Sequence, residues 1–168
     1  MFNKIPRGRV FLFGKNIDTD QIYPGRFVEL TDPADVVKHA MEGADPAFAA
    51  ACAPGDIIVA ESNFGCGSSR EHAAIALQTA GLGAVVASSF SRIFYRNGIN
   101  LGLPLLVCHD LHSKVKNGEV IAINLENGDI TLDSGKLIAK AEVVTDYMMN
   151  ILRNGGIKPM LRKELAEG

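Results

Sequence analysis

The chain is organised around residues 63–73, which read NFGCGSSREHA and are called the cradle below. An apolar run from Asp56 to Ala60 precedes the cradle and predicts a buried strand. An alanine-rich run that begins at Ala73 follows it and predicts a helix. The glycines between them allow a tight turn and a close approach of the backbone to a ligand. Because a helix start offers unpaired N–H groups and the positive end of a dipole, this stretch predicts a site for a carboxylate or a phosphate.

A purely structural role is the alternative for the same residues. Ser68 and Glu71 have the spacing of a capping box, in which the serine caps the helix and the glutamate reaches back to the N–H of the cap. Capping accounts for these two residues and one glycine. It does not account for Ser69, Arg70 and His72 beside them. The local pattern alone leaves a ligand site and a helix cap open.

Length and composition predict a soluble globular protein. With 168 residues the chain is long enough for a single domain, 1–168, with its own core. Hydrophobic residues make up 47% and charged residues 21%, which is ordinary for this class. A net charge of -2 argues against nucleic acid or an anionic membrane as a partner. The apolar runs are too short for a membrane span and no secretory segment precedes the first predicted strand, so we expect a cytoplasmic protein.

The sequence predicts no metal site within this chain. Cys52, Cys66 and Cys108 are widely spaced and form no CxxC pair, which excludes a local zinc or iron–sulfur signature. Asp18 and Asp20 lack the further oxygen ligands of a calcium loop. Hydrogen bonds within a turn are the preferred interpretation of Asp18, and a small half-buried side chain that of Cys66.

The rest of the chain predicts an α/β fold with a β-rich C-terminal part. Further strands are expected at residues 8–14, 84–87 and 105–108. Helices are expected at residues 31–42, 45–51, 69–81, 88–98 and 143–153. Residues 120–138 alternate around two glycine-containing turns and predict an antiparallel meander.

The predicted helix at residues 88–98 carries two arginines on one face. Its apolar side chains, Phe90, Ile93 and Phe94, are expected to face inward. Arg92 and Arg96 are separated by one helical turn. They form either a solvated positive face or a contact to an anion.

Three motifs, taken in order, resemble the aconitase superfamily. They are NIDTD at residues 16–20, the cradle, and SFSRIFYRN at residues 89–97. The chain looks like the separate small subunit of a 3-isopropylmalate dehydratase-type enzyme, and the resemblance covers nearly the whole chain. It implies a swivelling β/β/α domain, with a mixed central sheet flanked by helices, that closes over a large subunit.

The resemblance implies a hydro-lyase that acts as a heteromeric complex on a small malate-like acid. The family moves a hydroxyl between adjacent carbons by dehydration and rehydration. Its large subunit carries a [4Fe–4S] cluster that acts as a Lewis acid on the departing hydroxyl, and no cofactor is expected on this chain. Isomerisation of 2-isopropylmalate and 3-isopropylmalate in leucine biosynthesis is the first expectation. Hydro-lyases of 2,3-dimethylmalate, citraconate or homoaconitate are alternatives, and a non-catalytic anion-binding module is the alternative from another class.

The family motif assigns roles to the residues of the cradle. By this match Ser68 is the general base, and the N–H groups of the helix start together with Arg70 would stabilise its alkoxide. Ser69 and Arg70 match contacts to a substrate carboxylate, a task that suits a planar guanidinium. The supporting positions are Asp20, Gly65, Gly67 and His72.

In this family the loop after residues 18–20 selects the substrate. Here the loop reads YPGRFVELT at residues 23–31. Homoaconitase-type relatives place an arginine late in the loop, where this chain has Val28 and Glu29. Because Glu29 would repel an extra carboxylate, an apolar substituent such as isopropyl or methyl is favoured. Arg26 departs from this pattern, since it can serve the same carboxylate from another position.

Overall fold

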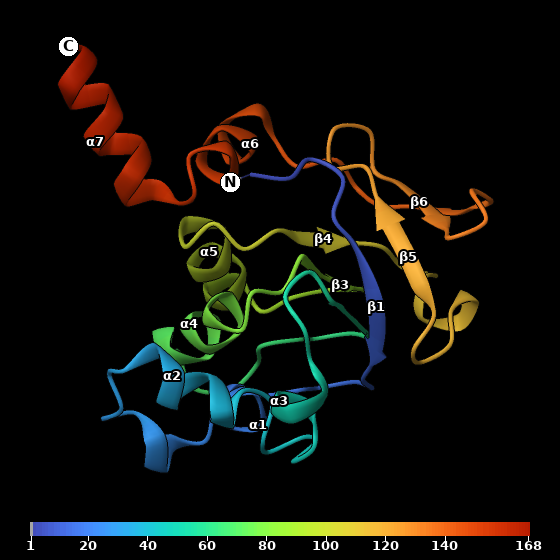
Figure 1. Cartoon of the computed structure of the whole chain (residues 1–168), viewed down its shortest axis with the longest axis horizontal. Coiled ribbons are helices and arrows are strands. Elements are labelled where there is room, and N and C mark those ends of the chain that lie inside the picture. Colours follow the sequence, from blue (N-terminus) through green and yellow to red (C-terminus); the bar gives the residue numbers. More distant parts are fainter. Residues whose placement is uncertain (1) are drawn as a thin grey trace.

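A mixed sheet forms the frame of the computed structural model, which describes residues 2–168. Its seven strands lie in the order β4-β3-β2-β1-β5-β6-β7 within the described residues. They are β1 Arg7–Leu12, β2 Ile57–Ala60, β3 Ala84–Ala87, β4 Leu105–Val107, β5 Val120–Ile123, β6 Asp129–Leu132 and β7 Leu137–Lys140. Strands β1 to β4 are parallel, whereas β5, β6 and β7 form an antiparallel meander that joins the sheet at β1. The expected mixed sheet with a β-rich C-terminal part is confirmed (Figure 1).

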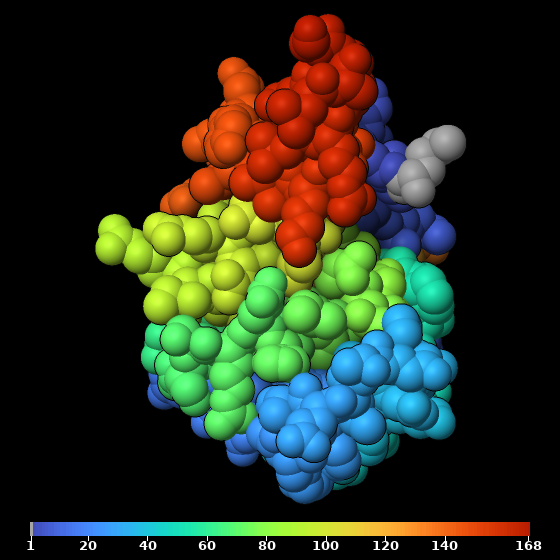
Figure 2. Space-filling view, turned by 90° about the vertical axis from the view of Figure 1, so that its left-hand side faces the viewer, coloured from blue at the N-terminus to red at the C-terminus, as the bar shows by residue number. Residues whose placement is uncertain are grey.

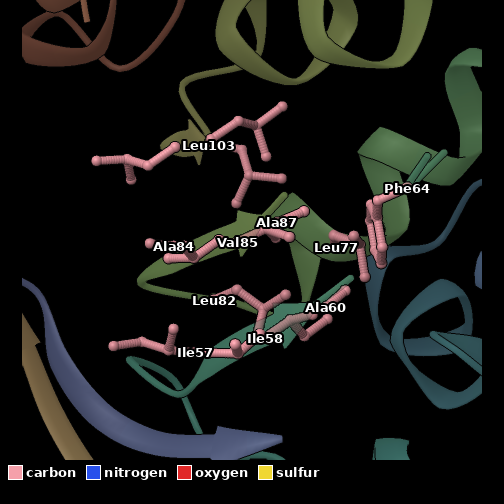
Figure 3. Packing of buried hydrophobic residues seen from close by; sticks show 14 of the residues in the cluster. Ile57, Ile58, Ala60, Phe64, Leu77, Leu82, Ala84, Val85, Ala87 and Leu103 are labelled. Carbon is pink, nitrogen blue, oxygen red and sulfur yellow. The ribbon is translucent and has the colours of Figure 1, made fainter. Parts of the chain in front are cut away.

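The burial of each strand explains its sequence. Every residue of β2 and β3 is buried, and both strands are accordingly apolar throughout. In β5 buried and half-buried residues alternate, because only one face of the meander packs on the core. Figure 3 shows Leu77 of the following helix and Phe64 of the cradle packed beside the last residues of β2 and β3. The carboxyl ends of the parallel strands are therefore fixed by well-packed side chains.

Helices connect the strands and cover the sheet. They are α1 Thr19–Ile22, α2 Pro33–Val36, α3 Phe48–Ala51, α4 Glu71–Thr79, α5 Arg92–Asn100, α6 Asp146–Arg153 and α7 Ile157–Glu167, with 3-10 turns η1 Gly25–Phe27, η2 Val37–His39 and η3 His112–Lys114. In Figure 1, α4 and α5 lie to the left of the strands and the meander lies to the right, while α7 projects away from the rest. None of the helices in residues 2–168 has the length and apolar character needed to span a bilayer.

The helices expected at residues 31–42 and 45–51 are shorter than predicted. The first breaks into α2 and η2, and the second is reduced to the four residues of α3. Met41 adopts a positive φ of 59° and donates its N–H to the carbonyl of Ile22 at 2.6 Å. This contact with the end of α1 draws the chain off the helical path, which the local pattern of apolar residues does not reveal.

Two further helices begin later than predicted. Helix α5 starts at Arg92 because residues 89–91 are extended: Ser89 and Ser91 bond through their backbones to Phe64 at 3.1 and 2.9 Å. Helix α6 starts at Asp146, where Thr145 caps it by accepting from the N–H of Met148. Both starts are set by hydrogen bonds that compete with helix propensity.

Candidate functional site

The backbone of the cradle brings the three sequence motifs together. The cradle leaves the carboxyl end of β2 and lies between residues 16–20 on one side and residues 89–91 on the other. Gly65 donates its N–H to the carbonyl of Ile17 at 2.7 Å, and Thr19 donates to the carbonyl of Cys66 at 2.8 Å. On the other side Phe64 forms an isolated parallel bridge with Phe90. Motifs that are far apart in sequence therefore form one structure at the end of the sheet.

Two glycines give the cradle its tight path. Gly65 has a φ of 83° and Gly67 a φ of 91°, a region that other residues rarely enter. A Cβ at Gly65 would lie 2.5 Å from the Cβ of Phe94, so a larger residue would push the cradle off α5. At Gly67 a Cβ would contact Asp18 at 3.4 Å. The predicted supporting role of both glycines has a direct geometric reason.

The capping box expected between Ser68 and Glu71 does not form. Helix α4 begins at Glu71 rather than Ser69, its N-cap is Arg70, and no side chain caps it. Ser68 instead uses its carbonyl, which accepts from the N–H of Arg70 and from the hydroxyl of Thr19, both at 2.9 Å. Ser68 and Ser69 are exposed at an uncapped helix start, where an anion is favoured. The structural alternative to a ligand site is therefore wrong for Ser68.

Asp20 ties the cradle to the loop of residues 23–31. Its Oδ1 lies 3.2 Å from Nη1 of Arg70 and accepts from the N–H of Gly25 at 2.8 Å. A Cβ at Gly25 would lie 2.6 Å from the same Nη1, so a larger residue there would displace the guanidinium from its present position. Since a half-exposed ion pair contributes only about 0–1 kcal/mol, its effect is to orient Arg70 rather than to stabilise the fold.

The loop residues Arg26 and Val28 do not line the small hollow that lies over the cradle. Arg26 pairs with Glu42 at 3.2 Å, and its guanidinium lies 4.6 Å from the ring centroid of Phe27. Val28 closes η1 by donating its N–H to the carbonyl of Gly25. His72 is exposed in the first turn of α4 and also does not line the hollow. The predicted roles of these three residues remain predictions.

A small hollow of about 20 Å³ lies over the cradle. It is lined by Thr19, Gly65, Gly67, Ser68, Ser69, Arg70, Ser91, Ile93, Phe94 and Asn97. Sites that enclose a small molecule usually measure about 300–1,000 Å³, so this hollow is only part of such a site. Its polar side chains converge at the carboxyl ends of parallel strands, where open α/β sheets bind ligands.

Several residues of this hollow were not predicted from the sequence. Ile93 was expected to face inward with Phe94, yet it is 48% exposed, whereas Phe94 is 2% exposed. Because neighbouring residues on a helix point about 100° apart, only one of the two can face the core squarely. Ile93 and Asn97 are four residues apart and line the hollow together. That spacing is the sequence signal that could have placed both at the site.

A larger hollow and a buried acid with a perturbed pKa lie at the opposite end of the parallel strands. A hollow of about 480 Å³ is found at the amino ends of the parallel strands, where Gly55, Gly83 and Pro104 line it. Nearby, desolvation raises the pKa of buried Asp56, but hydrogen bonds from Arg9 and from backbone N–H groups outweigh it, so the pKa is lowered overall. Desolvation, with the charge of Asp56, raises the pKa of Cys52 to about 11. Within residues 2–168 no group of three metal-binding side chains is placed to hold an ion.

Comparison with known proteins gives consistent matches. The family model of the aconitase C-terminal domain matches residues 9–109. The chain is 52% identical to the 3-isopropylmalate dehydratase small subunit 1 of Methanopyrus kandleri, over 94% of this chain and 93% of that one. It is 49% identical to the isopropylmalate/citramalate isomerase small subunit of Methanocaldococcus jannaschii, over 97% of each.

Solved structures show the same relationship. The crystal structure of 3-isopropylmalate dehydratase from M. jannaschii superposes with a TM-score of 0.90 at 40% identity, covering 96% of each chain. Aconitase X from Thermococcus kodakaraensis superposes with a TM-score of 0.53 at 18% identity, over 82% of this chain and 92% of that one. This second match bears on the fold alone.

Proposed function

We infer the function from the family: the chain belongs to the aconitase C-terminal domain family and, within it, to the 3-isopropylmalate dehydratase small subunits. We propose that it is the small subunit of a hydro-lyase that interconverts 2-isopropylmalate and 3-isopropylmalate. The reaction removes water and adds it back across adjacent carbons, as a step of leucine biosynthesis in the cytoplasm. The observation that supports this most strongly is the cradle, where exposed hydroxyls and a guanidinium surround an uncapped helix start in an incomplete hollow.

Arg70 and Ser69 bind a carboxylate of the substrate. The pair with Asp20 occupies Nη1 of Arg70 and leaves its other N–H groups without a hydrogen bond in the described residues. Those groups form a planar fork that matches the two oxygens of a carboxylate. The uncapped N–H groups of α4 add the positive end of the helix dipole on the same side. Together they orient the carbon that loses its proton.

Ser68 accepts that proton at Oγ. A free hydroxyl is a very weak base, so the site must favour the alkoxide over the neutral form. The N–H groups in the first turn of α4 can donate hydrogen bonds to this alkoxide, and the positive charge of Arg70 stabilises it further. When the double bond is rehydrated, the same Oγ returns a proton to carbon by microscopic reversibility.

The large subunit completes the hollow. In this proposal it supplies the [4Fe–4S] cluster, and this chain supplies the base and the carboxylate contacts. A hollow of about 20 Å³ cannot enclose a malate-like acid, so the reacting groups are shielded from water only when the two chains close on each other.

The loop favours a substrate with an apolar substituent. Arg26 pairs with Glu42 at 3.2 Å and its guanidinium lies over Phe27, so a neighbouring carboxylate already balances part of its charge. Val28 and Glu29 offer no positive charge in its place. One relative is named for both isopropylmalate and citramalate, so a methyl-bearing acid belongs in the same comparison.

The test is to mix the chain anaerobically with its large subunit and follow the absorbance of the unsaturated acid. We expect 3-isopropylmalate to react faster than citramalate, 2,3-dimethylmalate and homoaconitate. Ser68→Ala should lower kcat by about 10³-fold or more while the complex still assembles. Ser134→Ala, in the exposed turn between β6 and β7, is the control and should leave kcat unchanged. Full activity of the Ser68 variant would place the base elsewhere, and an assembled complex inactive on all four acids would refute the function.

A further inference from the structure

Three hollows adjoin one another along α5. The hollow of the cradle shares Asn97 with a second hollow of about 340 Å³, which extends between α4, α5 and the start of α7. The second shares Asn100 with a third of about 280 Å³, which lies between α5 and α6. Figure 2 shows this face, with the green cradle segment beside the yellow-green α5 and the red α7 above them. We call these three hollows and their lining residues the α5 strip.

The α5 strip exposes large side chains of the kind that protein interfaces use. Tyr147 at the start of α6 is 62% exposed, and Ile93 at the start of α5 is 48% exposed. Tyr95, Met148 and Ile151 line the floor of the third hollow. Tyrosine and arginine are enriched at the centres of interfaces because they offer large contact areas with polar ends.

The arginines of the strip lack ionic partners. Arg92 and Arg96 are exposed and line the third hollow, yet neither forms an ion pair within residues 2–168. Five other arginines each pair with a carboxylate: Arg7, Arg9, Arg26, Arg70 and Arg153. Lys158 adds a further unpaired cation at the second hollow. The strip thus combines a mostly apolar third hollow with an excess of positive charge, because Glu71 is the one carboxylate among the described residues that line it.

We propose that the α5 strip docks the large subunit of the proposed enzyme, through a surface of that subunit that carries apolar side chains and acidic residues. The inference rests on the proposed function, because it is the large subunit that closes the hollow of the cradle. Neighbouring hollows share Asn97 and Asn100, so a body that covers the cradle is placed to contact the adjoining strip as well.

Charge selects this occupant over a second copy of the chain. A twofold symmetric dimer places the same patch of each copy against the other. Arg92, Arg96 and Lys158 outnumber Glu71 among the lining side chains, so the two patches would carry the same sign of net charge, which opposes association. An acidic partner surface neutralises the same charges and accelerates the encounter.

The test is a charge reversal, R92E/R96E, compared with the control K116E/K136E. Lys116 and Lys136 are exposed, form no ion pair in the described residues, and lie before β5 and between β6 and β7, away from the strip. We expect R92E/R96E to raise the Kd for the large subunit by about tenfold or more, with a smaller ratio at high salt, and the control to change it by less than about twofold. Tyr147→Ala should raise the Kd by about tenfold independently of salt. Thermal unfolding of each variant confirms that it folds.

The outcomes separate the two proposals. At saturating large subunit, kcat of R92E/R96E should return to within about twofold of wild type, since a docking defect is overcome by mass action. If wild type binds and activates the large subunit but R92E/R96E and Tyr147→Ala bind equally well, the docking surface is overturned and the function stands. If R92E/R96E abolishes self-association and leaves the affinity for the large subunit unchanged, the strip is an interface between copies. If wild type neither binds nor activates the large subunit, both proposals fail.

Discussion

Gly65 is the residue whose replacement tests the geometry of the cradle most sharply. Gly65→Ala places a Cβ at a φ of 83°, where an L-residue is disfavoured by about 1–2 kcal/mol. The same Cβ would lie 2.5 Å from the Cβ of Phe94 and 2.7 Å from its Cδ1, closer than real Cβ contacts occur. Forcing such an overpacked contact adds about 1–3 kcal/mol, so the total loss in the free energy of unfolding is about 2–5 kcal/mol.

Gly135→Ala provides a matched control for this change. Gly135 has nearly the same φ, 90°, but no atom lies within 4 Å of the position of its Cβ. Its replacement should therefore cost only the backbone part, about 1–2 kcal/mol. The difference between the two variants isolates the contact between the cradle and α5.

Urea unfolding at equilibrium measures both losses from the shift in midpoint at constant slope. Gly65→Ala should also lower the activity of the assembled enzyme, because the hydroxyls of Ser68 and Ser69 move with the cradle backbone. If Gly65→Ala destabilises the protein no more than Gly135→Ala does, the packing of the cradle on Phe94 described above is incorrect.

Further predictions concern the buried charge of Asp56, directly before β2, and the thiol of Cys52 at the end of α3. Asp56→Asn should lower the free energy of unfolding by about 1–3 kcal/mol near pH 7, because Asp56 accepts from Arg9 and from two backbone N–H groups. Folding lowers the pKa of Asp56, so the ionised carboxylate stabilises the folded protein at pH values above its unfolded pKa of about 3.9. The difference in free energy of unfolding between wild type and variant, measured by chemical denaturation, should therefore narrow as the pH falls below that value. A gap that widens on acidification would contradict this. Cys52, with a pKa of about 11, should react with iodoacetamide at pH 8 far more slowly in the native protein than in urea, as followed by mass spectrometry, and equal rates would argue against its desolvation.

Most of the sheet could be predicted from the sequence. Continuous apolar runs predict β2 and β3, since strands buried on both faces need apolar residues at every position. Alternation around Asn127-Gly128 predicts the meander, where Gly128 adopts a φ of 83°. Both signals are local, so a single sequence carries them.

Helix boundaries and parts of the site could not be predicted from local sequence patterns. The start of α5 depends on backbone bonds between Phe64 and residues 89–91, and the break after α2 depends on the bond from Met41 to Ile22. Such contacts join segments that are distant in sequence, and no local propensity encodes them. The capping spacing of Ser68 and Glu71 was misleading, because the carbonyl of Ser68 accepts from Thr19 and the helix begins two residues later than a cap at Ser68 requires.

The roles of the cradle residues came from the resemblance rather than from local pattern. Local pattern left a ligand site and a cap open, and the structure removes the cap. In the structure, residues of the motifs at 16–20 and 89–97 lie beside the cradle, as a shared site requires. The assignment of Ile93 and Asn97 to the site depends on the orientation of α5, which the sequence does not give.

The central claim is that the cradle is half of an active site. The most direct measurement is the initial rate of unsaturated acid formation from 3-isopropylmalate at a fixed, cluster-loaded amount of the large subunit, as this chain is titrated in under anaerobic conditions. We expect no turnover by either chain alone and a rate that rises and saturates as the chain is added. A rate that stays at background throughout the titration, together with tight binding of a dicarboxylate by the isolated chain in calorimetry, would contradict it and identify an anion-binding module instead.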